Sequence, residues 1–199
     1  MFLFSLVKRL VQLVVLGAVS YFLVSGVQVV LASRTPGAVA AAPKRPVAIV
    51  AATGSASGPL DADFSARLGH AAALAAAGRV GRVAVFATSE AQALRARAYL
   101  GHHGVPARDV SSFWARQLPG DFHLYDRSKL SRQALLVSDS WQVLWLDHLA
   151  AADGVQVVAS PIAPTNGGIG NEASTIALQA AAVCWGRIAG FTQTGFIAG

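Results

Sequence analysis

Residues 82–106 read RVAVFATSEAQALRARAYLGHHGVP, an apolar run followed by a helical pattern. The stretch opens with RVAVFAT, a short and nearly continuous apolar run that is typical of a strand buried on both faces of a parallel sheet. A helical stretch follows at once, with Ser89 placed to cap its N-terminus, Glu90 in its first turn and Gly104 as its stop. A buried strand that leads directly into a helix predicts a βα unit of an α/β domain.

The same alternation recurs along the chain. Besides 82–88, apolar runs that predict strands lie at 47–53, 134–139 and 155–161, with a weaker one at 109–114. Predicted helices lie at 63–77 (capped by Asp61 or Asp63, stopped by Gly78), from Asp139 or Ser140 as cap to about Ala152, and at 172–190 (capped by Asn171, stopped by Gly190). Strand and helix in alternation predict right-handed crossovers. We therefore expect a Rossmann-like parallel sheet flanked by helices.

A long apolar segment precedes this domain. Residues 10–32, LVQLVVLGAVSYFLVSGVQVVLA, carry no charge, and a helix of this length rises roughly 34 Å, enough to cross a hydrocarbon core of ~30 Å. A cleaved signal peptide is the alternative, with VLA at 30–32 or AVA at 38–40 as cleavage sites. The length favours an uncleaved transmembrane helix that contacts the lipid bilayer, since the apolar part of a signal peptide is usually shorter.

The domain organisation follows from this segment. We expect a membrane anchor over 1–33, a linker of small residues and prolines over 34–46, and the α/β domain over 47–199. Lys8 and Arg9 favour an N-terminus in the cytoplasm, whereas Arg34 and the pair at 44–45 oppose it. The short cationic N-terminal tail predicts a single-pass protein of the cell membrane whose soluble domain is extracytoplasmic.

Charge and cysteine content exclude several classes of site. Five of the sixteen basic residues precede position 46, where no acidic residue occurs, so the remaining domain is nearly neutral. A basic stripe on the domain, as nucleic-acid binding requires, is therefore not expected. The single Cys184 excludes an intrachain disulfide and a multi-cysteine zinc site, and its apolar helical surroundings predict a small buried side chain.

Candidate ligand-binding residues follow from a topological rule. In open parallel sheets ligands bind beyond the carboxyl ends of the strands, where the strand order reverses. The residues that follow the predicted strands there are Thr53, Gly54 and Ser55, then Thr88 and Glu90, then Ser138 and Asp139. Thr53 to Gly58 can form an anion-binding turn, and Asp139 can either bind a ligand or cap the next helix.

The sequence identifies no catalytic residue and no metal site. The histidines are dispersed, without an HxxxH pair, and the GxSxG turn of many hydrolases is absent. His102 and His103 lie at the far end of their helix, where cations interact favourably with the helix dipole, so we expect a solvated helix end. Trp141 and Trp145, four residues apart, are expected to pack in the core or against a membrane.

Several stretches together resemble one known family. They are VAIVAATGSASG (47–58), ARLGHAAALAAAG (66–78), RVAVFAT, SEAQALRARAYLGHHGVP (89–106), LLVSDS (135–140) and EASTIALQAAAVCWGRIAGF (172–191). In these pieces the chain resembles the YdcF-like family of bacterial envelope proteins, which includes SanA and ElyC. The resemblance implies a Rossmann-like domain and a role in cell-envelope or peptidoglycan homeostasis. It adds Arg67 to the candidate ligand-binding residues, and it implies binding of a nucleotide-like ligand such as S-adenosylmethionine, or of a cell-wall metabolite.

The chain also departs from the family pattern. The polar Thr…Glu-Asn segment is missing from residues 111–133, and Gln142 and Trp145 occupy positions where the family tends to have histidine and arginine. Two functional hypotheses follow. One is an anchored envelope protein with a small-molecule pocket, and the other is a non-catalytic scaffold of the same fold that contacts an envelope protein partner.

Overall fold

A computed structural model describes the chain except for residues 1, 34–36, 53–59, 115–117, 163–168 and 192–199. A parallel five-stranded sheet forms its centre, in the order β3-β2-β1-β4-β5. The strands are β1 (Val47–Ala51), β2 (Arg82–Ala87), β3 (Val110–Trp114), β4 (Gln133–Val137) and β5 (Gln156–Ala159). All five strands predicted from the apolar runs form, and the α/β fold with a helix-flanked parallel sheet is confirmed.

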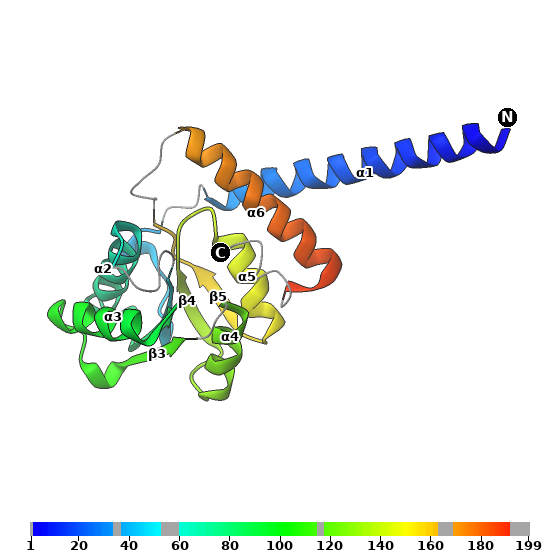
Figure 1. Ribbon diagram of the computed structural model, residues 1–199. Helices are drawn as coiled ribbons and strands as arrows, with labels where there is room; N and C mark the ends of the chain where they lie inside the picture. The colour runs from blue at the N-terminus through cyan, green and yellow to red at the C-terminus, as the bar shows by residue number, and fades with distance from the viewer. Residues whose placement is uncertain (1, 34–36, 53–59, 115–117, 163–168, 192–199) are drawn as a thin grey trace.

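The sheet is buried on both faces. The central strand β1 is buried at every position and pairs with β2 on one side and β4 on the other, which explains its unbroken apolar sequence. Helices α2 (Ala62–Ala76) and α3 (Glu90–His102) cover one face. Helices α4 (Leu118–Arg127), α5 (Val143–Ala152) and α6 (Ile169–Ala189) lie on the other (Figure 1).

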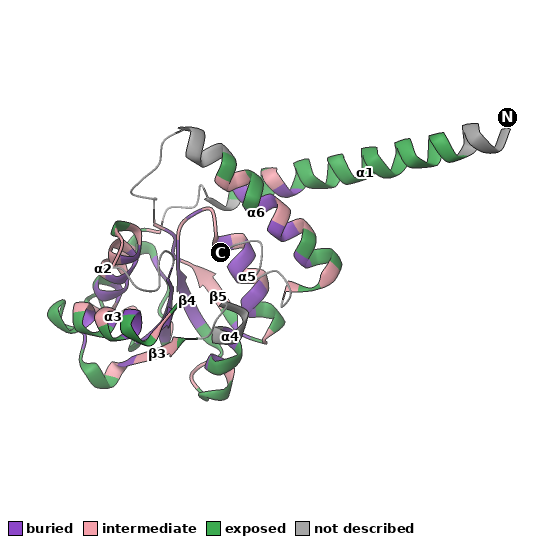
Figure 2. Cartoon of the chain, in the orientation of Figure 1, coloured by how far each residue is buried: buried purple, intermediate pink, exposed green. Residues whose placement is uncertain are grey.

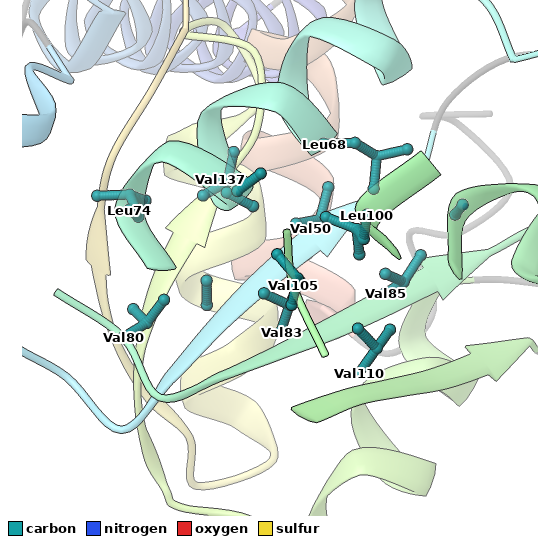
Figure 3. Close-up of a cluster of buried hydrophobic side chains, with 14 of the residues drawn as sticks. Val50, Leu68, Leu74, Val80, Val83, Val85, Leu100, Val105, Val110 and Val137 are labelled. Carbon is teal, nitrogen blue, oxygen red and sulfur yellow. The ribbon is translucent and has the colours of Figure 1, made fainter. Parts of the chain in front are cut away.

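Each face has its own apolar core. Val50, Val83 and Val85 project from the sheet toward Leu68 of α2 and Leu100 of α3, as Figure 3 shows. The opposite core contains Phe86 of β2, whose ring meets those of Phe113, Phe122 and Tyr125 edge-on at centroid distances of 4.8 to 6.0 Å. Side chains alternate between the two cores along each strand, as the period of two requires.

The predicted ends of the first two helices are confirmed. The carboxylate of Asp61 accepts a hydrogen bond from the backbone N–H of Phe64, and the hydroxyl of Ser89 accepts one from the N–H of Gln92. Gly78 and Gly104 follow these helices with φ of 65° and 84°, in the left-handed region that glycine tolerates best.

The predicted caps of the later helices are wrong. α5 begins at Val143 with Gln142 as its cap residue, because a turn in which the N–H of Gln142 donates to the carbonyl of Asp139 separates β4 from the helix. The carboxylate of Asp139 does not cap α5, because it accepts hydrogen bonds from the guanidinium of Arg67. α6 begins at Ile169, so Asn171 lies inside that helix. Helix α4 occupies a region for which the sequence predicted no element.

The N-terminal helix α1 (Phe2–Ser33) projects far beyond the sheet (Figure 1). Its segment Val7–Leu31 is long and apolar enough to cross a membrane. Most of it is exposed, as Figure 2 shows, but α6 packs across its C-terminal half, where Ser25 and Val29 are completely buried. Cys184 of α6 is half-buried at this crossing, with its Sγ 3.2 Å from Oγ of Ser25.

Candidate functional site

The strand order reverses at the carboxyl ends of β1 and β4. The chain leaves β1 toward β2 and returns to add β4 on the opposite side of β1. In open parallel sheets, ligands commonly bind at such a reversal, beyond the carboxyl ends of the two strands. Asp139 lies two residues beyond β4 and is held beside the continuation of β5 by a bridge to Ile162. On the other side of β4 lies β1, which ends at Ala51.

An ion pair between Arg67 and Asp139 lies at this position. Nε of Arg67 donates to Oδ1 of Asp139 at 3.0 Å and Nη2 donates to Oδ2 at 2.5 Å, so the pair is bidentate. Nη1 of Arg67 donates to the carbonyl oxygen of Ala51 at 2.6 Å. One guanidinium therefore joins α2, the end of β1 and the turn after β4, and fixes these three elements relative to one another.

The two partners differ in exposure. The Arg67 side chain is 0% exposed, whereas that of Asp139 is 14% exposed. Burial raises the pKa of the Asp139 carboxyl, the charge and hydrogen bonds of Arg67 oppose this rise, and the charges of Asp63 and Asp61 add to it. The carboxylates of Asp63 and Asp61 thus add negative charge near Asp139, while Arg67 supplies the opposing positive charge.

Thr88 and Ser138 are engaged in a shared pattern. Each follows a strand, and each hydroxyl donates to the side-chain carbonyl of a glutamine four residues later: Thr88 to Gln92 at 2.9 Å, and Ser138 to Gln142 at 3.2 Å. Gln92 also accepts from the N–H of Thr88 at 2.8 Å. These contacts hold the turns that leave β2 and β4.

The structure therefore brings together part of the predicted ligand-binding set. Arg67 and Asp139 are in contact, and Thr88 and Ser138 lie at the same edge of the sheet. Glu90 is exposed in the first turn of α3, where its charge suits the helix dipole. The remaining predicted residues, Thr53, Gly54 and Ser55, lie outside the described residues.

The sequence did not predict a second contact, between His70 of α2 and Ser160. Nε2 of His70 lies 2.9 Å from Oγ of Ser160, which follows β5 and is almost fully buried. His70 follows Arg67 by three residues and therefore shares its face of α2. That spacing was the available signal, but nothing in the sequence indicated which loop this face would meet.

Acidification is expected to destabilise the protein through His70. Burial lowers the pKa of His70 below its ordinary value of 6.5, so the unfolded chain takes up this proton first as the pH falls. The stabilisation that neutral His70 contributes is complete above pH 6.5. It is lost as the pH falls through the lowered pKa of His70 in the folded protein. Thermal unfolding of the full chain in detergent between about pH 7 and pH 5 should show a smaller loss in His70→Gln than in the wild type. His102→Gln, at an exposed helix end, is the control, and equal losses in wild type and His70→Gln would contradict the expectation.

The remaining histidine and tryptophan predictions are confirmed. His102 and His103 are exposed at the end of α3, as expected, and His103 stacks on Tyr99 with a centroid distance of 4.1 Å. Trp145 is buried in the core, and Trp141 packs at its edge with a buried Nε1 that meets no acceptor among the described residues. Among those residues no group of three or more His, Cys, Asp or Glu side chains is arranged to hold a metal ion.

The comparisons with known proteins supply no relative. The chain matches no family model, no curated protein and no solved structure. The fold and the geometry around Arg67 and Asp139 are therefore the grounds for a function.

Proposed function

We propose that this protein is a membrane-tethered, envelope-associated domain of YdcF-like type that binds a small metabolite between the carboxyl ends of β1 and β4. The Arg67–Asp139 ion pair, at the reversal of strand order, is the main support for this function. Its arginine is completely buried while its carboxylate retains 14% exposure. A carboxylate held by two donors on one side still offers lone pairs on the other, so it can accept hydrogen bonds from a ligand.

The charge at this edge narrows the ligand class. Asp61 and Asp63 add negative charge near the carboxylate of Asp139, and a site rich in carboxylates attracts donors and cations more than phosphate. We favour ligands that present hydroxyl or amino groups, such as cell-wall sugars and muropeptides, or the ribose and sulfonium of S-adenosylmethionine. The extracytoplasmic placement and the role in peptidoglycan homeostasis are parts of the same proposal.

A non-catalytic scaffold is the second candidate. It is favoured by the internal pairing of Arg67, Thr88 and Ser138, whose hydrogen bonds all close within the protein. In a scaffold these contacts serve only to hold the turns at the carboxyl edge, and an envelope protein partner takes the place of the small ligand.

Ligand-induced stabilisation separates the two candidates. Full-length protein in lipid nanodiscs is heated with muropeptide fragments, nucleosides or S-adenosylmethionine at about 100 times Kd, where a ligand that binds only the folded state adds about 2.7 kcal/mol. This corresponds to a Tm rise of about 5–10 °C. Asp63→Asn should reduce the rise for an amine-bearing or cationic ligand, whereas Asp153→Asn, at the end of α5, should not. If no class of ligand shifts the Tm, the scaffold is favoured.

A further inference from the structure

The free part of α1 is too short to cross a bilayer alone. Lys8 and Arg9 mark one end of its apolar run, and the other end of the free part is Val24, because Ser25 is completely buried. A helix over Leu10–Val24 rises only about 22 Å, against a hydrocarbon core of ~30 Å. The apolar run continues to Leu31, through the part of α1 that α6 crosses. If the whole run lies in the membrane, the crossing lies there too.

The exposed face of α6 is apolar. Leu178, Trp185 and Ile188 are 56%, 49% and 73% exposed, and Ala181 is half-buried between them. Their spacing of three, four and three residues places these four side chains on one face, opposite the side that packs on the domain. Between Ser174 and Gly186 the helix carries no charged residue. Isolated exposed apolar residues are common, but a continuous apolar stripe on a helix indicates an interaction surface.

This face is continuous with the membrane helix. A hollow of about 510 Å³ lies between α1 and α6, and only apolar residues line it, among them Phe22, Gly26 and Val30 of α1 and Ile176 and Ala180 of α6. Ala177 also lines it and is exposed beside Leu178. The exposed side of α1, the hollow and the stripe on α6 therefore form one apolar surface, most of which belongs to the segment long enough to span a membrane.

We propose that α6 is a membrane-embedded element of the domain, with Leu178, Ala181, Trp185 and Ile188 in contact with lipid acyl chains. The helix lies at the boundary of the bilayer, a placement in which tryptophan is favoured. The hollow beside α1 is filled by acyl chains. The inference rests on the membrane tether of the proposed function and adds a second, non-spanning contact to it.

Tryptophan quenching by brominated lipid tests this placement. Of the four tryptophans, Trp114, Trp141, Trp145 and Trp185, none lies in α1, so insertion of α1 alone gives no quenching. Full-length protein is reconstituted in phosphatidylcholine vesicles with and without bromine on the acyl chains. We expect strong quenching in the wild type that is largely lost in Trp185→Phe. Trp114→Phe is the matched control, because Trp114 is 47% exposed at the end of β3, and it should retain the quenching.

The failures of the two proposals are distinguishable. Flotation with the vesicles reports the α1 tether, and bromine quenching reports α6. Protein that floats but whose fluorescence does not change with bromine, or is quenched equally in Trp185→Phe, overturns the placement of α6 and leaves the tether. Trp185 that is protected from bromine but cross-links to a second copy overturns it in favour of a protein interface. Protein that does not float overturns both.

Discussion

Replacing Asp139 by alanine is expected to lower the free energy of unfolding by about 3–5 kcal/mol. The substitution leaves the guanidinium of Arg67 completely buried, with only the carbonyl of Ala51 as its described partner. A charge that is buried without a counter-charge costs far more than the ion pair itself contributes. Chemical denaturation of the full chain in detergent measures the loss.

Two further variants test the explanation. The double variant Arg67→Met with Asp139→Leu removes both charges, and it should be less destabilised than either single substitution. Asp126→Ala breaks the ion pair with Arg132, which has a similar N–O distance of 2.9 Å, but the Arg132 side chain is 69% exposed. That loss should stay within about 1 kcal/mol. A loss of this small size in Asp139→Ala would contradict a buried, uncompensated arginine.

Truncation of Phe86 should destabilise the protein to a similar extent. Phe86→Ala is expected to cost about 3–5 kcal/mol, because the ring is completely buried on β2 and its loss leaves a cavity among three other aromatic rings. The same denaturation measurement applies. Leu94→Ala, on the exposed side of α3, is the control and should change stability by no more than about 0.5 kcal/mol. A cost below about 1 kcal/mol for Phe86→Ala would mean that neighbouring side chains refill the space.

The sheet was predictable because its signal is local. A strand buried on both faces requires a continuous apolar run, and residues 47–51 or 82–87 present one regardless of their neighbours. The caps at Asp61 and Ser89 and the stop at Gly104 were predictable for the same reason, since each acts on backbone groups within a few residues. The turn after β4 could not be predicted in this way, because the Asp139 carboxylate binds the distant Arg67 rather than the nearby helix α5.

The candidate site depends on contacts that a single sequence does not display. Arg67 and Asp139 are 72 residues apart, and His70 and Ser160 are 90 apart. The topological rule located the edge of the sheet at which Asp139, Thr88 and Ser138 lie, but it named no pairs. The packing of α6 across α1 was missed because both helices read as apolar along most of their length, which leaves their partners unspecified.

The packing of α6 on α1 restricts how the domain can move relative to α1. A domain joined to its membrane helix by a flexible linker samples a hemisphere above the bilayer, and a longer linker enlarges the volume that the domain can reach. Here α6, which belongs to the folded domain, packs directly on α1, and Ser25 and Val29 are buried at the C-terminal half of α1. With α1 in a membrane, as we propose, this contact fixes the height and tilt of the carboxyl edge of the sheet relative to the bilayer. The domain then diffuses laterally with the membrane but does not extend away from it.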